Sequence, residues 1–377
     1  MGIRPVRRCT TAALSLVLAL VLALAAVASA AVATWTSVAT PNVGSLPNAL
    51  NGVAALSPAS VWSVGHSYSG SLAAYRTLVE RWNGTSWSVV PSPNATSAYN
   101  ELYDVAALSP TSAWAVGYAN STTPGTSSAL IERWNGTSWS ISPVSAAGTL
   151  ESVAASSASD VWAVGGALAM HFDGNSWSTV PTPPPSSGAL NAVATLGPSD
   201  AWAVGSFPVS SHPRTDSTLI EHWNGTSWQV VPSPNAAGSA TNILHGVVAL
   251  GPANVWAVGW YYPTGSQTSE TLIEHWDGVS WQIVQSPNGS GRSVLWDVTA
   301  LSSTDVWAAG YFLSTTGLRT LVEHWDGQSW TVNPSPNPGI GPRLQAIASA
   351  GPGTVWAVGI KGNGTTDRTL ALRTTQG

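Results

Sequence analysis

Repeated Glu-His-Trp triplets hold the side chains of this 377-residue chain that look best suited to chemistry. The triplets begin at Glu221, Glu274 and Glu323. A carboxylate beside an imidazole could serve acid/base catalysis or bind a metal ion. Adjacent residues of a β-strand point to opposite faces, however, so the Glu and His of one triplet cannot meet at one atom. We therefore interpret the triplets as structural, with hydrogen bonds between neighbouring strands or repeats.

The other copies of the triplet support this interpretation. The His slot holds Arg81 and Arg133 in two copies, and Met170 or Leu372 replaces the Glu in two others. Catalysis needs one constellation rather than several near-copies. His residues elsewhere show no metal-ligand spacing. We therefore predict no catalytic residue, no metal site and no cofactor from these patterns.

A second motif shows which elements carry the triplets. The pattern [VA]-W-[AS]-[VA]-G occurs seven times, at intervals of 40 to 54 residues. The copies lie at Val61–Gly65, Ala113–Gly117, Val161–Gly165, Ala201–Gly205, Val255–Gly259, Val306–Gly310 and Val355–Gly359. Each follows an L-x-x-[VI] segment and precedes a third apolar segment that meets Asn-Gly or Asp-Gly, typical of a type I′ hairpin turn. Each unit is thus predicted to form four antiparallel strands, A to D.

Seven such units predict an all-β, seven-bladed β-propeller of four-stranded antiparallel blades. The seventh unit stops after strand C, and its missing strand D is found near the N-terminus, where 33–42 align with Thr226–Asn235. Blade 7 is therefore split between 34–42 and 344–374, and pairing of the two end strands closes the ring. Residues 31–377 form one predicted domain, which we expect to be monomeric.

The first thirty residues are predicted to be a secretory signal peptide. Three Arg precede an apolar run over Ala12–Val27, and Ala28-Ser29-Ala30 resembles a cleavage site. The alternative is an uncleaved membrane anchor. Removing 1–30 takes away three of the 13 basic residues and the only Cys, leaving 18 acidic residues and no disulfide. We expect a secreted or cell-surface protein that binds no nucleic acid and, once cleaved, no membrane.

The combined pattern V-x-x-L…D-x-W-A-V-G…N/D-G-x-S-W resembles the repeats of secreted bacterial propellers of the BNR/Asp-box and Ycf48-like type. The resemblance covers essentially the whole chain after the signal. It implies a bacterial origin and the propeller fold, and its motifs specify fold rather than activity.

Two tryptophans are not required by the repeat. Of 21 Trp, 19 occupy recurring positions of strands B, C and D, where they are expected to pack between blades. The remaining two are Trp260 and Trp296. Trp260 is predicted to open the fifth B–C loop beside Tyr261 and Tyr262, and Trp296 to lie in the next strand A beside Asp297. The B–C and D–A loops vary most and share one face, the top, where binding usually resides.

The second position of L-x-x-[VI] should face the central channel, because strand A is innermost in a propeller. Around the ring this position holds Asn51, Tyr103, Glu151, Asn191, His245, Trp296 and Gln345. Such diversity between nearly constant Leu and Val residues suits one asymmetric ligand. The alternative is a solvent-filled channel that tolerates any polar residue.

These residues predict a non-enzymatic binding module whose top face binds a glycan or an extracellular protein by aromatic stacking and hydrogen bonds. One alternative is an extracellular glycoside hydrolase or lyase. Its titratable candidates would be Tyr103, Asp104, Glu151, His245 and Asp297. A further alternative is an adhesion or scaffold protein without a small ligand.

Overall fold

The computed structural model describes residues 1–2, 33–120, 127–184, 188–211 and 214–375. The chain divides into two units, Met1–Val32 and Ala33–Gly377, and the second holds every strand. Apart from its first two residues, the predicted signal peptide lies outside the described residues and stays a prediction. The described residues contain strands β1 to β28 and no helix, and none of them forms a helix long and apolar enough to cross a membrane.

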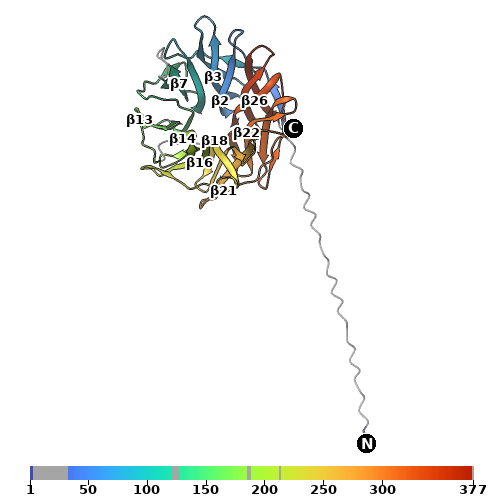
Figure 1. Ribbon diagram of the computed structural model, residues 1–377. Helices are drawn as coiled ribbons and strands as arrows, with labels where there is room; N and C mark the ends of the chain where they lie inside the picture. Colours follow the sequence, from blue (N-terminus) through green and yellow to red (C-terminus); the bar gives the residue numbers. More distant parts are fainter. Residues whose placement is uncertain (3–32, 121–126, 185–187, 212–213, 376–377) are drawn as a thin grey trace. The chain divides into compact units, whose positions relative to one another are not determined.

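The unit of the fold is a four-stranded antiparallel meander, of which the fourth blade is an example. It comprises β14 (Ala189–Gly197), β15 (Asp200–Ser211), β16 (Arg214–Trp223) and β17 (Trp228–Val230), paired in that order. Seven such blades are arranged in a ring (Figure 1), which confirms the predicted seven-bladed propeller. A parallel bridge between Asp216 and Thr241 also joins the fourth and fifth blades.

The other blades repeat this order from the channel outward. The remaining innermost strands are β2 (Asn48–Ser57), β6 (Asn100–Ser109), β10 (Ser152–Ser157), β18 (Ser239–Gly251), β22 (Ser293–Ser302) and β26 (Ile340–Ser349). The second strands are β3 (Ser60–Ser69), β7 (Ser112–Asn120), β11 (Asp160–Gly165), β19 (Asn254–Pro263), β23 (Asp305–Ser314) and β27 (Val355–Gly362). The third are β4 (Ala74–Trp82), β8 (Ser127–Trp134), β12 (Leu168–Phe172), β20 (Glu270–Trp276), β24 (Gly317–Trp325) and β28 (Asp367–Thr375). The outer strands are β5 (Trp87–Val89), β9 (Trp139–Ile141), β13 (Trp177–Thr179), β21 (Trp281–Ile283), β25 (Trp330–Val332) and β1 (Thr34–Val38).

The two ends of the chain close the ring as predicted. Strand β1 pairs antiparallel with β28, with Trp35 opposite Thr374, so the last blade has the order β1-β28-β27-β26. The Asn42 side chain accepts a hydrogen bond from the backbone N–H of Thr369 at 3.1 Å. In the fourth blade Asn235 does the same for Thr218 at 3.0 Å. The Pro-Ser-Pro-Asn segment after strand D is therefore a structural clip, and the seam between the termini reproduces it.

Tryptophans form the contacts between blades, which confirms their assignment to packing. Trp62 of the first blade is fully buried and contacts Trp134 and Trp139 of the second, with ring centroids 5.0 and 5.3 Å apart. The same arrangement joins the seventh blade to the first through Trp356 and its neighbours Trp82 and Trp87. Large aromatic surfaces buried at each junction hold the ring together.

The His of each triplet has the structural role predicted for it. His222 lies 2.9 Å from an oxygen of Asp200 and packs on the Trp202 ring at 4.3 Å. The residue type at the His position depends on the residue that precedes Val-Trp or Ala-Trp in the second strand of the same blade. Where that residue is Asp or Asn, the His position holds His; where it is Ser or Thr, the His position holds Arg. Arg81, for example, lies over the Trp62 ring at 4.9 Å. The slot thus provides a cation or imidazole for the Trp face in every blade.

The Glu of the triplet does not make the hydrogen bonds that we expected. Its copies are at most 2% exposed; they are Glu80, Glu132, Glu221, Glu274 and Glu323. At least one buried carboxyl oxygen of each has no hydrogen-bond partner among the described residues. In the first blade the cross-strand neighbours of Glu80 are Ser63 and Val89, and neither donates to it. Burial raises the pKa of Glu80 and Glu132 to about 8 and that of Glu221 to about 7.

The C–D hairpins are confirmed, but their turn type was predicted wrongly. Trp223 pairs with Trp228 around a four-residue loop, so the turn is longer than a two-residue type I′ turn. Only Gly225 has positive φ, at 90°. The Asn224 side chain accepts hydrogen bonds from the N–H groups of Thr226 and Ser227, at 2.9 and 3.0 Å. This Asx-type bonding stabilises the loop with Asn224 itself at negative φ.

Candidate functional site

A β-bulge turns one residue of six innermost strands towards the channel, and in the third blade the equivalent Glu151 directly precedes β10. In β2, Leu50 pairs with Gly65 and Gly52 pairs with Val64, which leaves Asn51 without a partner. The same shift occurs in β6, β14, β18, β22 and β26. The Gly that ends the [VA]-W-[AS]-[VA]-G motif permits this geometry, because a Cβ on Gly65 would lie 2.1 Å from the carbonyl oxygen of Ala49. The motif and the bulge are therefore parts of one local structure.

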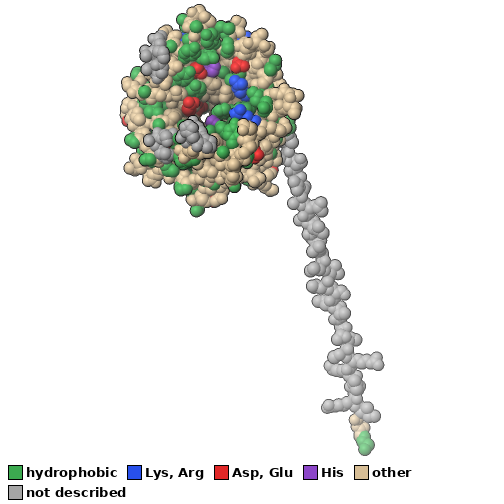
Figure 2. Space-filling view, viewed as in Figure 1, with side chains coloured by type: hydrophobic (Ala, Val, Ile, Leu, Met, Phe, Trp, Pro, Cys, Tyr) green, Lys and Arg blue, Asp and Glu red, His purple; other side chains and the backbone are tan. Residues whose placement is uncertain are grey.

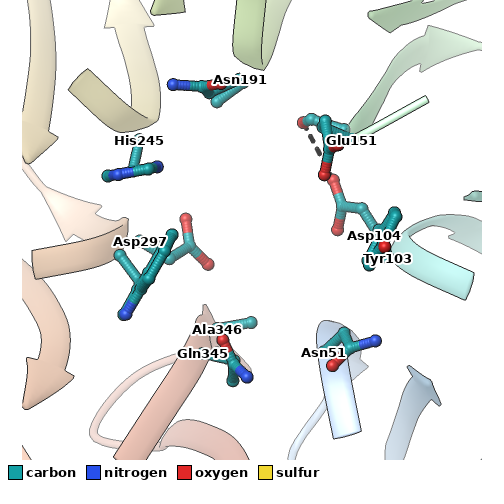
Figure 3. Close-up of a pocket in the computed structure, with 12 residues that line it drawn as sticks. Asn51, Tyr103, Asp104, Glu151, Asn191, His245, Asp297, Gln345 and Ala346 are labelled. Carbon is teal, nitrogen blue, oxygen red and sulfur yellow. Dashed lines mark hydrogen bonds between the residues drawn. The ribbon is translucent and has the colours of Figure 1, made fainter. Parts of the chain in front are cut away.

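The seven residues predicted to face the channel converge on one cavity of about 430 Å³. Figure 3 shows labelled side chains from the innermost strands around its open centre. Its lining consists of Asn51, Tyr103, Asp104, Glu151, Ser152, Asn191, Ala192, His245, Trp296, Asp297, Gln345 and Ala346. The seven residues predicted from the sequence thus form one layer of the cavity wall. The residue that follows each of them in sequence forms a second layer in five blades.

Two amides of the ring hold blades together. The Asn51 side-chain NH₂ donates to the carbonyl oxygen of Leu102 in the next blade at 2.9 Å. Asn191 makes the equivalent bond to Leu244 at 2.7 Å. Gln345, in contrast, makes no side-chain hydrogen bond with any described residue. The amide nitrogens of both Asn residues are thus used by the fold, while their oxygens have no partner among the described residues.

The second layer contains two carboxyls that bridge neighbouring blades. Asp104 accepts hydrogen bonds from the Val153 N–H at 2.9 Å and the Ser152 hydroxyl at 3.0 Å. Asp297 accepts one from the Ile347 N–H at 2.8 Å. Burial outweighs these bonds and raises the pKa of Asp104 to about 6 and that of Asp297 to about 7. A change in their protonation near neutral pH would therefore alter the charge of the cavity.

An aromatic group at the channel consists of His245, Trp296 and Trp260. The rings of His245 and Trp296 lie 4.1 Å apart, and the Trp260 indole N–H donates to His245 Nε2 at 3.1 Å. Burial lowers the pKa of His245 to about 4, so its imidazole is neutral at neutral pH. Because Nε2 accepts this bond, the neutral ring carries its proton on Nδ1. The indole N–H of Trp296 is buried and has no partner among the described residues.

The predicted position of Trp260, Tyr261 and Tyr262 needs correction. They do not open a loop, because β19 continues to Pro263 and pairs these residues with the opposite strand. Alternation along the strand places Trp260 and Tyr262 on one face, with ring centroids 5.0 Å apart. Tyr261 points the other way, packs against the core between the fourth and fifth blades and donates to Glu270 at 2.5 Å. None of the three lines the cavity.

A tyrosine-rich cluster between the first two blades was missed by the sequence analysis. Tyr75 contacts Tyr68, His66 and Tyr99, with ring centroids 5.2, 4.5 and 5.5 Å away. Only Tyr99 is exposed, at 38%. The sequence signal was available, because none of these Tyr belongs to the repeat. Subtracting the repeat from the eight Tyr, as was done for Trp, would have identified them.

Glu101 connects this cluster to the channel. It is 8% exposed, lies 3.1 Å from His66 Nδ1 and accepts a hydrogen bond from the Tyr118 hydroxyl at 2.7 Å. Burial alone would raise the pKa of Glu101, but the bonds to His66 and Tyr118 outweigh it and lower the pKa. Tyr118 in turn stacks on Tyr103 of the channel at 5.7 Å. Groups of three or more His, Cys, Asp or Glu suited to a metal ion do not occur among the described residues.

Comparisons with known proteins identify the fold and no family. No protein-family model matches the sequence, and neither does any curated protein. Among solved structures, Ycf48 bound to D1 peptide is 14% identical, with a TM-score of 0.59 over 91% of this chain and 97% of that one. The WD40 propeller domain of Doa1 is 11% identical, with a TM-score of 0.60 over 91% and 98%.

An ancestral GH74 enzyme also shares the fold. It is 15% identical with a TM-score of 0.54, and the match covers 89% of this chain and 47% of that one. At such low identity these likenesses establish the propeller architecture alone. Proteins of this architecture host unrelated functions, so function has to be argued from the site itself.

Proposed function

We propose that this protein is a secreted or cell-surface binding module that holds a glycan or protein ligand at its channel mouth without covalent change. One observation carries the proposal: seven equivalent positions of the ring hold six residue types around one cavity. The flanking Leu residues, for example Leu50 and Leu102, are fully buried and constant, so the variation is confined to the side chains at the cavity. A single asymmetric ligand would need this arrangement.

The hydrogen bonds of the site favour binding over catalysis. Asp104 and Asp297 each accept backbone N–H bonds that join blades. His245 accepts the Trp260 N–H at the nitrogen that a general base would use. Glu151 is exposed to the cavity and makes no side-chain hydrogen bond with the described residues. A single carboxyl without a positioned partner suits ligand contact better than acid/base chemistry.

The first test is a ligand screen followed by site variants. A glycan array and a panel of extracellular proteins would be probed with the purified protein, and each hit measured by calorimetry. We expect Trp296→Ala to weaken binding at least tenfold, because it removes an aromatic face from the cavity. Asp173→Asn is the matched control, since it lies in a C–D turn on the opposite face and three other blades carry Asn at that position.

Two outcomes would count against the proposal. Ligand affinity unchanged in Trp296→Ala, with thermal stability also unchanged, would remove the channel from the binding site. Turnover of a polysaccharide that is abolished by Glu151→Gln would instead favour the glycoside hydrolase or lyase alternative.

A further inference from the structure

The ionisable groups that line the cavity are acidic or uncharged at neutral pH. Asp104, Glu151 and Asp297 contribute carboxyls, and no Lys or Arg of the described residues lines the cavity. Burial lowers the pKa of His245 to about 4, so its imidazole is neutral at neutral pH. The nearby Glu101 adds to burial in raising the pKa of Glu151. The cavity therefore holds several carboxyls, and the described residues that line it include no cation to balance them.

Three of the basic side chains near the same face have partners elsewhere. Arg343 lies 3.8 Å from an Asp367 oxygen. Arg76 and Arg368 each donate to two backbone carbonyls, at distances between 2.9 and 3.4 Å. Figure 2 shows acidic side chains beside the hollow of this face and basic ones to one side of it. These contacts leave the carboxyls of the cavity without an ion pair among the described residues.

The rest of the lining is suited to a cation as well. The aromatic rings of Trp296 and Tyr103 supply faces that attract positive charge. The Asn51 and Asn191 amides each use one N–H in the fold, so their oxygens remain as acceptors and their second N–H groups as donors. A fitting ligand would thus present a cation with a hydrogen-bond acceptor close to it.

We infer that the channel cavity selects ligands that carry an ammonium or guanidinium group, as found in amino sugars and in Lys or Arg side chains. The inference rests on the proposed function, because it specifies the ligand of the same site. Both sources share the chemistry that matters here, which is a cation flanked by hydroxyl or carbonyl acceptors. Acidic ligands would meet the carboxyls of Asp104, Glu151 and Asp297 and be disfavoured.

The inference also predicts how pH affects binding. Asp104 and Asp297 lose their protons mainly between pH 5 and 8, because burial raises their pKa to about 6 and about 7. A bound guanidinium or Lys ammonium keeps its charge over this range and favours the ionised carboxyls, so its affinity should rise. The other titratable groups that line the cavity are Tyr103, Glu151 and His245. Burial raises the pKa of Tyr103 and Glu151 and lowers that of His245 to about 4, so Tyr103 and His245 stay uncharged over this range and ionised Glu151 adds to the rise.

The experiment compares matched cationic and neutral probes by calorimetry on the purified protein. One pair is acetyl-Gly-Arg-Gly-amide and its citrulline analogue; the other is a chitosan tetramer and the N-acetylated chitin tetramer. We expect the cationic member of one pair to bind about tenfold tighter than its neutral analogue, the effect of one charge-assisted hydrogen bond. The pair that shows the preference identifies the source, protein or amino sugar.

Variants connect the preference to the cavity. Glu151→Gln should abolish most of the tenfold preference, because it removes a carboxyl that has no structural partner. Asp173→Asn removes the same charge from the same blade on the opposite face and should leave the preference intact. Equal binding within both pairs, tighter binding of the neutral members, or no binding of either cationic probe at millimolar concentration would overturn the inference. The proposed function would fail separately, if no ligand from the screen depended on Trp296.

Discussion

The buried carboxyl of Glu80 should make this protein less stable as pH rises. Glu80 is fully buried, has no hydrogen-bond partner among the described residues, and burial raises its pKa from 4.5 to about 8. Between those values the folded state keeps the proton and the unfolded chain loses it. Stability then falls by about 1.4 kcal/mol per pH unit for this one group, or about 3 kcal/mol from pH 5 to pH 7. Below 4.5 both states are protonated and the effect disappears.

Single variants isolate this effect from the other titrating groups. Leu372 and Met170 occupy the same slot in two blades, so the site accepts apolar residues. The free energy of unfolding of Glu80→Leu should therefore exceed that of wild type by a margin that is about 3 kcal/mol larger at pH 7 than at pH 5. Glu80→Gln should show the same loss of pH dependence without the change in polarity. Leu372→Glu should add one buried carboxyl, so the free energy of unfolding of this variant should fall more steeply with pH than that of wild type.

Urea unfolding followed by Trp fluorescence at pH 5, 6, 7 and 8 measures these slopes directly. A wild-type free energy of unfolding that is constant over this range would refute the reasoning. So would a Glu80→Gln variant whose free energy of unfolding changes with pH as steeply as that of wild type. Either result would mean that Glu80 is ionised in the folded protein, or that water reaches it.

Three further predictions concern contacts within blades, between blades and at the seam between the termini. Gly52→Ala should destabilise the protein by about 1–3 kcal/mol in urea unfolding, because its Cβ would lie 2.7 Å from backbone of the next blade, whereas Gly197→Ala opens onto free space and should be neutral. Asp200→Ser and His222→Arg should each destabilise, while the double variant recreates the pair of the first blade and should recover about 0.5–3 kcal/mol of coupling in a double-mutant cycle. Asn42→Ala removes the clip at the seam and should cost about 1 kcal/mol, seen as a lower Tm; an unchanged Tm would mean that the seam does not depend on the clip.

The blade count and the closure were readable from the sequence because both depend on repetition. Seven copies of one motif, and a displaced strand containing Trp35, leave few alternatives to a closed ring. The ring of channel residues was also predictable, because one fixed position of strand A recurs in every blade. Local geometry was less accessible. The Asn224 side chain decides the turn type through hydrogen bonds to the loop, and sequence periodicity does not report them.

Long-range consequences of packing were hidden in the same way. Tyr261 is adjacent to Trp260 in sequence, yet β19 extends far enough to send the two side chains to opposite faces. Glu80 looked like a hydrogen-bonding residue, but both of its cross-strand neighbours turned out to offer no donor to it. The bridging role of Asp104 depends on the offset between neighbouring blades, which no single repeat reveals.

Pairing of β1 with β28 also determines the order of events in folding. Thr36 and Arg373, which are hydrogen-bonded across this seam, are 337 residues apart, whereas the hairpins within each blade join near neighbours. Bringing such distant segments together is entropically unfavourable, so we expect it to be the last step. The first strand synthesised must then wait for the last one, as part of an open arc whose end strands are unpaired. Such an arc is the species most exposed to pairing with another chain, which makes the seam the point where folding competes with aggregation.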